Sequence, residues 1–319
     1  MHRIGFLLSD GFQIMALASQ SVFEYANVVV GEAFYVLGNF SVDGGEVRSS
    51  LGMPVGTRPL RGRLEVDTWI VAGVNDPLSS PAPDGVLAFL RKAGHRARRI
   101  AGICTGAFVL AEAGLLANRR ATTHWAYARE MQKRFPDIRV EEDRIYIVDG
   151  SIWTSAGMTA GLDLALAMVE KDLGEDTARS VAHGLVMHQR RAGGQSQHSE
   201  MLDLAPKSDR IQTALNYARQ NLSRALTVEE LAEAAHLSLR QFSRVFTLET
   251  GQSPAKAVER LRLEAARLMI EQSRHPFDVI AKETGFRDRR HLRDVFTRGF
   301  GIPPQAVRRD AHLDVQGAF

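Results

Sequence analysis

The sequence predicts a two-domain protein in which an α/β domain with a parallel sheet precedes an all-α domain. Three observations predict this organisation. Apolar runs typical of buried strands alternate with helical patterns over residues 1–190. A polar, glycine-containing stretch then interrupts both patterns. The residues beyond it show only helical periodicity, and they contain an internal repeat.

The composition excludes several classes of protein. Hydrophobic residues make up 45% and charged residues 24% of the 319-residue chain, which excludes a largely disordered protein. The single cysteine, Cys104, can form neither an internal disulfide nor a cysteine-rich zinc cluster. The apolar run at residues 4–8 is too short for an export signal, and no run reaches the roughly 18 residues of a membrane helix. We therefore expect a cytoplasmic protein without a metal, a cofactor or a membrane partner.

Short apolar runs in the first domain indicate strands, and longer periodic stretches indicate helices. Their alternation is the order of a parallel sheet with helices on its faces. Asp149 and Gly150 form a two-residue hairpin signal between residues 144–148 and 151–154. The expected strands are Ile4–Leu8, Ala33–Leu37, Thr68–Ala72, Arg99–Ile103 and Ile145–Val148, and the expected helices are 84–94, 105–116, 125–135 and 157–172.

The domain boundary lies in a polar stretch. Gly193, Gly194 and Pro206 break helical and strand periodicity there. We expect domains at residues 1–190 and 208–310, joined by a linker at 191–207. Residues 208–319 contain 18 basic and 14 acidic side chains, and all but two of the basic ones are arginines. The second domain is therefore the basic part of the chain.

The second domain contains a duplicated pattern. Its first copy is marked by Leu231, Leu237, Phe242, Phe246, Gly251 and Pro254, and its second by Ile280, Phe286, Leu292, Phe296, Gly301 and Pro304. The copies are offset by 49 residues before the central turn and by 50 after it. Two helix-turn-helix units with slightly different turns show such a change.

Helix starts within the repeat follow capping rules. Residues 227–230 and 238–241 are capping boxes, and Asp288 is an N-cap for a helix at 289–299. Residues 253–254, a serine and a proline, open a long helix between the two units. The pattern predicts two helix-turn-helix units joined by one helix.

The second helix of each unit carries the side chains that suit DNA reading. Arginine forms two hydrogen bonds with guanine and glutamine forms two with adenine, so such a face suits a helix in the major groove. The alternative, a merely solvated arginine-rich face, is disfavoured because the repeat and the caps place these residues on the second helices. The predicted DNA-binding residues are Arg240, Gln241, Ser243 and Arg244 in the first unit and Arg289, Arg290 and Arg293 in the second.

Residues 226–270 and 279–309 closely resemble the AraC/XylS family of bacterial transcription regulators. The resemblance implies that the recognition helices enter successive major grooves of double-stranded promoter DNA. The second unit departs from the family at His291, Leu292 and Asp294, where small polar, aromatic and arginine residues respectively are commoner. Base contacts by the second unit are therefore expected to be weaker than those by the first.

In the first domain, Cys104 lies within a Gly-x-Cys-x-Gly sequence between an expected strand and an expected helix. The glycines permit the tight turn of a nucleophile elbow, which would present the sulfur at the carboxyl edge of the sheet. We expect the helix start to lower the pKa of the thiol; a small buried structural cysteine is the alternative. His124 is the nearest candidate base, although a lone histidine beside a tryptophan more often has a structural role. Gly73 with the backbone of Thr105 is a candidate anion-binding nest.

The first domain resembles the class I glutamine amidotransferase-like domain of the PfpI and ThiJ group, which implies a flavodoxin-like parallel sheet with flanking helices. Residues 102–128 and 145–170 are especially similar to GlxA-type regulators, which fuse this domain to an AraC/XylS domain. Enzymes of the group place a carboxylate in the first helix to hydrogen-bond the cysteine, whereas this chain has Ala16 there. We therefore expect a ligand pocket without catalytic residues. It comprises Ala16, Gly73, Cys104, Thr105 and His124.

Two functions remain open from the sequence. The first is a transcriptional activator that binds operator DNA and RNA polymerase as a homodimer. A small nitrogenous metabolite, a class implied by resemblance to regulators of amino-acid and quaternary-amine catabolism, would bind its first domain. The second is a thiol-dependent hydrolase or hydratase of the PfpI type with a DNA-tethering domain. Ala16 counts against the enzyme, and the complete pair of helix-turn-helix units favours the regulator.

Overall fold

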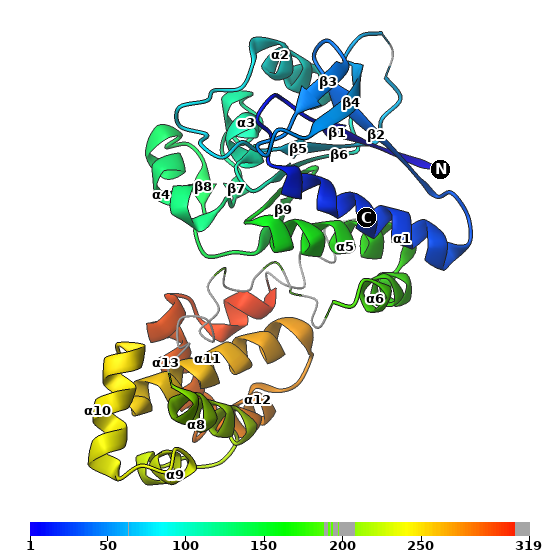
Figure 1. The fold of residues 1–319 in the computed structure, drawn as a ribbon. Helices are drawn as coiled ribbons and strands as arrows, with labels where there is room; N and C mark the ends of the chain where they lie inside the picture. Colours follow the sequence, from blue (N-terminus) through cyan, green and yellow to red (C-terminus); the bar gives the residue numbers. More distant parts are fainter. Residues whose placement is uncertain (63, 188–190, 192, 194–196, 198–207, 310–319) are drawn as a thin grey trace. The chain divides into compact units, whose positions relative to one another are not determined.

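The computed structural model describes residues 1–309 except 63, 188–190, 192, 194–196 and 198–207. The chain divides after Gln197 into two compact units. The first unit is α/β and the second is α-helical (Figure 1).

An eight-stranded sheet forms the centre of the α/β unit. The six central strands are parallel, and an antiparallel strand closes each edge. The strands are β1 (His2–Leu7), β2 (Tyr35–Ser41), β3 (Gly45–Arg48), β4 (Pro54–Pro59), β5 (Thr68–Ala72), β6 (Arg99–Ile103), β9 (Tyr146–Asp149) and β10 (Ile152–Ser155), in the spatial order β3-β4-β2-β1-β5-β6-β10-β9. The short strands β7 (Arg120–Ala121) and β8 (Arg139–Val140) pair separately. The predicted parallel sheet is confirmed.

Helices cover both faces of this sheet (Figure 1). One layer consists of α1 (Gln20–Val30), α5 (Met158–Leu173) and α6 (Glu175–Gly184), with the 3₁₀ helix η1 (Ile14–Ser19) before α1. The other layer consists of α2 (Asp84–Ala93), α3 (Gly106–Glu112) and α4 (Trp125–Arg134). Strand side chains alternate between the two cores: Ile4 and Phe6 pack in the first, and Leu7 packs in the second. Because both faces are buried, every residue of β5 and β6 is buried, and both strands are mostly apolar.

Several element boundaries differ from the sequence prediction. The strand expected at 33–37 is observed at Tyr35–Ser41, because the Asn27 side-chain amide holds both backbone groups of Tyr35 at 2.8 Å and fixes where the strand begins. Sequence periodicity does not predict α1, β3 or β4. Strands β3 and β4 form a polar edge rich in glycine and proline, which gives no apolar strand signal. The predicted hairpin is confirmed, with Gly150 at a φ of +61° in the β9–β10 turn.

An ion-pair network lies at the amino ends of the strands, opposite the end where Cys104 follows β6. Asp172 of α5 pairs with Arg99 and, at 2.8 Å, with Arg98, and it accepts a hydrogen bond of 3.1 Å from the Tyr35 hydroxyl. Burial lowers the pKa of the neighbouring His2 and raises that of Tyr35. The buried Arg99–Asp172 pair thus links α5 to β6, and loss of either partner would leave the other charge buried and uncompensated.

Three described residues of the expected linker contact the α/β unit. Arg191 pairs with Asp163 of α5 at 2.7 Å, and the Gly193 carbonyl accepts a hydrogen bond from the Tyr146 backbone. The Gln197 side-chain amide donates to the Thr123 carbonyl at 2.8 Å. These residues therefore extend the first unit beyond the expected boundary at 190.

Two small cores share one long helix in the α-helical unit. The helices are α8 (Asp209–Gln220), α9 (Val228–Ala234), α10 (Leu239–Thr250), α11 (Pro254–Gln272), α12 (Phe277–Glu283) and α13 (Arg289–Phe300). The first half of α11, including Leu261, packs with α8, α9 and α10. The second half, including Leu263, packs with α12 and α13. The structure thus confirms two helix-turn-helix units joined by a helix.

Candidate functional site

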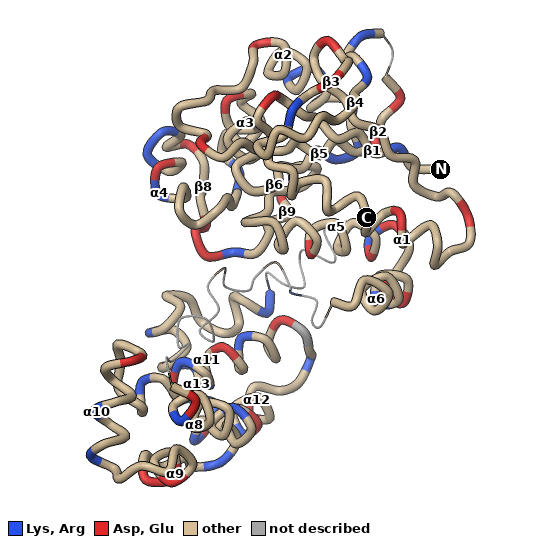
Figure 2. Tube along the Cα trace, viewed as in Figure 1, with Lys and Arg blue, Asp and Glu red and all other residues tan. Residues whose placement is uncertain are grey.

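Helix α10 forms the second helix of the first helix-turn-helix unit. Ser238 caps its start, and Gly251, at a φ of +72°, ends it. Phe242 and Phe246 are buried against the unit's core, which directs Arg240 and Arg244 to solvent. Figure 2 draws the lysine and arginine positions of the chain, including those of α10, in blue. The exposed face has the residue types that read DNA in a major groove.

The cap limits what Gln241 can do. Its Oε1 accepts hydrogen bonds from the Ser238 backbone N–H at 3.3 Å and from the Ser238 hydroxyl at 2.9 Å. Recognition of adenine needs Oε1 as an acceptor and Nε2 as a donor at the same time. Gln241 therefore cannot hold the cap and read adenine with both groups simultaneously. Ser243 is half-buried on the same helix.

Helix α13 holds its arginines differently. Asp288 caps the helix by accepting from the His291 backbone N–H at 2.7 Å. Asp294 lies 3.9 Å from Arg290 and 3.3 Å from Arg293, measured between nitrogen and oxygen. Arg289 packs over the Phe277 ring at 5.6 Å. All three arginines are exposed, so these contacts are weak and leave the guanidinium groups accessible to phosphate or bases.

The structure adds a residue to the α10 surface that the sequence prediction omits. Leu248 is 83% exposed and follows Arg240 and Arg244 at successive intervals of four residues, which places all three on one helix face. The four-residue spacing of Arg240, Arg244 and Leu248 is the sequence signal that could have identified Leu248. An exposed leucine on this face suits contact with a thymine methyl group or a protein partner.

Cys104 occupies a nucleophile elbow between β6 and α3. Its φ is +55°, a conformation that non-glycine residues adopt rarely and mainly at functional or strained turns. The Cys104 N–H donates to the Ser155 carbonyl at 3.1 Å, and its carbonyl accepts from the Thr123 hydroxyl at 3.0 Å. Gly106 is required by close packing, because a Cβ there would overlap the Val71 carbonyl. The predicted elbow geometry is confirmed.

The prediction of an acidic Cys104 thiol is wrong. The residue is only 7% exposed, and burial raises the pKa of the thiol to about 11. Hydrogen bonding to Thr105 lowers the pKa, but this effect is smaller than the loss of water around the thiolate. The thiol is therefore neutral near pH 7 and a poor nucleophile in this conformation.

The other predicted pocket residues lie around this elbow. Gly73 packs directly on Thr105, since a Cβ at Gly73 would overlap the Thr105 hydroxyl oxygen. That hydroxyl donates to the Val74 carbonyl at 2.6 Å. Ala16 is buried in η1 and belongs to the same apolar cluster as Cys104. The space between Gly73 and Thr105 is thus filled by their own contact.

His124 has a structural role as the N-cap of α4. Its Nδ1 accepts a hydrogen bond from the Ala126 N–H at 3.3 Å and thereby caps α4. The ring also lies against Gly157, where a Cβ would be 3.5 Å from His124 Cδ2. The preceding residue, Thr123, binds the Cys104 carbonyl. The fold therefore brings the two sequence segments together through a side-chain-to-backbone hydrogen bond.

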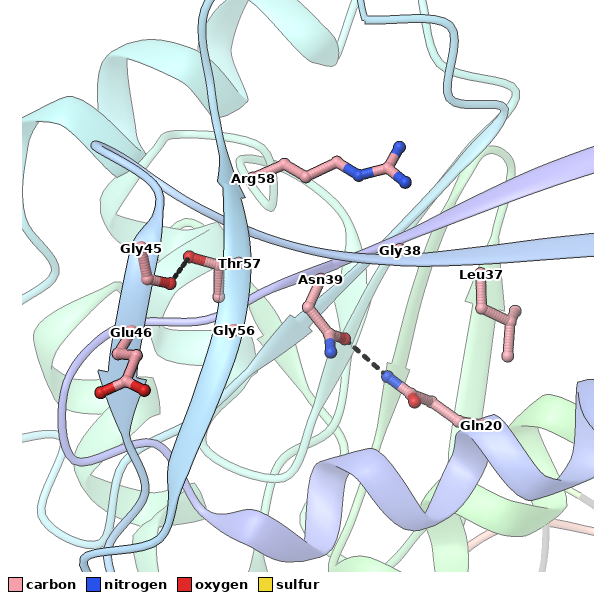
Figure 3. Close-up of a pocket in the computed structure, with 9 residues that line it drawn as sticks. All are labelled: Gln20, Leu37, Gly38, Asn39, Gly45, Glu46, Gly56, Thr57 and Arg58. Carbon is pink, nitrogen blue, oxygen red and sulfur yellow. Dashed lines mark hydrogen bonds between the residues drawn. The ribbon is translucent and has the colours of Figure 1, made fainter.

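A polar cavity of about 540 Å³ lies on the sheet edge, between β2 and β4 (Figure 3). These strands pair only at Phe40 and Ser41, so they diverge beside Gly38 and Gly56. Gln20 of α1 donates to Asn39 at 2.7 Å across the cavity wall. The sequence prediction does not include this cavity.

Two classes of site are absent from the part of the chain that the structure describes. It contains no group of three or more histidine, cysteine, aspartate or glutamate side chains placed to hold a metal ion. None of its helices combines the length and apolar character needed to cross a membrane.

Comparison with known proteins relates both units to characterised families. A helix-turn-helix domain model matches residues 231–310, and the DJ-1/PfpI family model matches residues 32–171. The HTH-type transcriptional regulator GlxA of Rhizobium meliloti (strain 1021) is 32% identical, with 97% of this chain and 96% of that protein covered. The chain belongs to this family of helix-turn-helix transcriptional regulators. The regulator is also 29% identical to the HTH-type transcriptional regulator GbdR of Pseudomonas aeruginosa, over 97% of this chain and 85% of that one.

Two solved structures and one enzyme are each similar to part of the regulator. An AraC family transcriptional regulator from Pseudomonas putida has a TM-score of 0.52 and 23% identity, covering 58% of this chain and all of that one. A ThiJ/PfpI family protein from Pseudomonas syringae has a TM-score of 0.50 and 24% identity, over 60% and 76% of the two chains. These two structures support the fold. An isonitrile hydratase of Pseudomonas putida is 43% identical over 95 residues, which is 30% of this chain and 40% of the enzyme.

Proposed function

We propose that this DNA-binding regulator activates transcription by contacting RNA polymerase, and that a small metabolite held by its α/β unit controls it. The observation that carries the DNA-binding part of the proposal is the pair of complete helix-turn-helix units, each with its own core and an exposed arginine-bearing helix. In the first unit these side chains include Arg240 and Arg244; in the second, Arg289, Arg290 and Arg293. Because its target is chromosomal DNA, the proposed location is the cytoplasm.

Selection of operator DNA with the full chain tests the proposal. We expect the wild type to enrich a site with two half-sites and to stimulate transcription from it by RNA polymerase in vitro. The Arg240→Ala/Arg244→Ala variant should lose both effects while keeping its unfolding temperature, because both side chains are exposed. Enrichment of no sequence by a folded wild type would contradict the proposal, and binding without stimulation would indicate a repressor.

We further propose that Cys104 performs no catalytic turnover. Burial keeps its thiol neutral, and the position of the family's activating carboxylate is Ala16. Amide, ester, nitrile, isonitrile and glyoxal substrates should therefore show no turnover that Cys104→Ser abolishes. A robust rate lost in Cys104→Ser would overturn this part of the proposal.

The alternative function, a thiol-dependent hydrolase or hydratase with a DNA-tethering unit, is favoured by two specific observations. The left-handed conformation of Cys104 is the backbone geometry of a nucleophile elbow. The isonitrile hydratase is also similar over 95 residues. The same substrate panel decides between the two functions, because only the enzyme predicts Cys104-dependent turnover.

A homodimer is the proposed assembly. Helix α1 exposes apolar side chains, among them Tyr25, Val28 and Val29, and Val28 is 66% exposed. Burial of such a patch against a second copy would stabilise the pair. Sedimentation at micromolar concentration should show a dimer for the wild type and a monomer for Val28→Lys. A strict monomer for the wild type, with and without DNA, would contradict the dimer.

A further inference from the structure

A second cavity of the α/β unit, about 520 Å³ in volume, lies between α2 and the segments that precede β5. Figure 1 shows α2 on the side of the sheet opposite α1 and α5. The volume falls in the usual range of sites for small molecules. Every residue that lines the cavity belongs to the first unit, so the site needs no contribution from the DNA-binding unit.

The cavity floor is aromatic and apolar. Trp69 of β5 and Phe89 of α2 pack edge to face, with ring centroids 4.7 Å apart. Leu60, Leu64 and Val66 are among the other apolar residues of the lining. A ligand's ring or branched chain would find here both dispersion contacts and aromatic edges.

Trp69 also offers a hydrogen-bond donor. Trp69 is 3% exposed; no acceptor for its indole N–H is found among the described residues, and that nitrogen is not one of their fully buried polar atoms without a partner, so it reaches solvent. Trp153, in contrast, donates its indole N–H to the Gly150 carbonyl at 3.3 Å. An indole N–H without a protein acceptor can serve a polar ligand atom.

The remaining lining residues add a strong positive charge. Arg61, Lys92 and Arg96 line the cavity, while its one acidic residue, Asp43, pairs with Arg61 at 2.6 Å. Lys92 and Arg96 are exposed, and no acidic partner for either is found within the described part of the unit. Two cations are thus available for an anion at the edge of an apolar floor.

We propose that this cavity binds a small amphipathic anion, namely a carboxylate with an aromatic or branched apolar body. The body lies against Trp69 and Phe89, and Lys92 and Arg96 bind the carboxylate. This ligand is the metabolite that controls the regulator. Its regulatory role rests on the function proposed above. A nearby ammonium group opposes binding, because the cations of the site outnumber its one carboxylate.

Fluorescence titration tests the ligand class directly. The chain has three tryptophans, so Trp125→Phe/Trp153→Phe leaves Trp69 as the sole indole reporter. We expect saturable binding of 3-phenylpropanoate or 4-methylpentanoate to the full chain, confirmed by calorimetry on the wild type. 3-Phenylpropanamide, which lacks the charge, and phenylalanine, which adds an ammonium group, should bind at least tenfold more weakly. Failure of both carboxylates to bind, or tighter binding of phenylalanine, would overturn the proposal.

Substitutions test the position of the site. Lys92→Gln/Arg96→Gln should weaken the bound carboxylate at least tenfold. The matched control Arg91→Gln should not, because Arg91 lies in the same last turn of α2 but does not line the cavity. Ala88→Phe, which fills the cavity from an exposed helix position, should abolish binding without lowering the unfolding temperature. Undiminished binding by both cavity variants would place the ligand elsewhere and overturn the assignment.

Operator binding by the ligand-free chain separates this inference from the proposed function. Specific DNA binding with no carboxylate binding would contradict the cavity assignment alone. Carboxylate binding by a folded chain that selects no DNA would contradict the proposed function alone. If both hold, the carboxylate should change operator affinity or transcription in the wild type and not in Ala88→Phe; no change in the wild type would overturn the effector role.

Discussion

The two helix-turn-helix units share an architecture but hold their arginines differently. Arg240 and Arg244 of α10 are exposed, and neither has an acidic partner within the described residues. In α13, Arg290 and Arg293 both contact Asp294. Exposed ion pairs of this kind contribute about 0–1 kcal/mol. DNA contacts by Arg290 and Arg293 compete with these weak contacts, so we expect the first unit to provide most of the base discrimination and the second to provide mainly affinity for the DNA backbone.

The largest expected effect concerns the joint action of the two units. Inserting five base pairs between the half-sites of a selected operator turns one half-site by about half a helical turn. We expect affinity to fall to that of unrelated DNA, a loss of about 10³-fold or more. Anisotropy titration at fixed salt measures it. Unchanged affinity would mean that the second unit does not read DNA, which would break the comparison.

Single arginine substitutions should separate base reading from charge. Arg240→Ala or Arg244→Ala should cost about 1–3 kcal/mol of binding free energy and relax preference at one or two base pairs. Arg293→Ala should weaken all sequences alike and reduce the salt slope by about one unit. Repeating the operator selection with each variant measures the preference, and Arg210→Ala in α8 is the exposed control. A sharper loss of preference in Arg293→Ala would reverse the assignment of roles.

Removal of Asp294 should make the second unit more like the first. Asp294→Asn frees Arg290 and Arg293 and removes a negative charge that phosphate would face. We expect tighter binding to all sequences by about 0.5–1 kcal/mol, with a steeper salt dependence. Asp278→Asn in α12 makes the same charge change off α13 and controls for net charge. Equal gains from both variants would show that the Asp294 contacts do not restrain the arginines.

The smallest expected binding effect concerns the cap of α10. Ser238→Ala should lower the free energy of unfolding of the α-helical unit by about 1 kcal/mol, because it removes the acceptor for the Gln241 N–H. Gln241→Ala should weaken the same cap and leave base preference unchanged. Urea unfolding and operator selection measure the two quantities. Relaxed preference at an adenine in Gln241→Ala would show that the cap opens on DNA.

Local signals in the sequence predict helices and strands well, but they predict the burial and the pKa of individual side chains poorly. The apolar runs of β1, β5 and β6 and the capping boxes of α9 and α10 are written in adjacent residues, and all are confirmed. The pKa of Cys104 depends on burial by elements distant in the sequence, so the helix start alone predicts the wrong direction.

The positions of the two cavities could not be predicted from local sequence signals either. The cavity beside α2, proposed above to bind an amphipathic anion, is lined by Asp43, Arg61, Trp69 and Arg96, whose proximity follows from the packing of α2 on the sheet. The edge strands β3 and β4 lack an apolar run, so the cavity beside β4 has no sequence signal either. For Gln241, the sequence indicates both a cap and a base contact; the hydrogen bonds to Ser238 show that the two compete.

The shared helix α11 restricts how such regulators can diverge. Leu261 belongs to one core and Leu263 to the other, so no stretch of α11 between the two units is free of core contacts. Inserting one residue there would rotate the second unit by about 100° and advance it by about 1.5 Å. Evolution toward operators with a different spacing would therefore proceed through insertions of nearly whole helical turns, or through compensating changes in both cores.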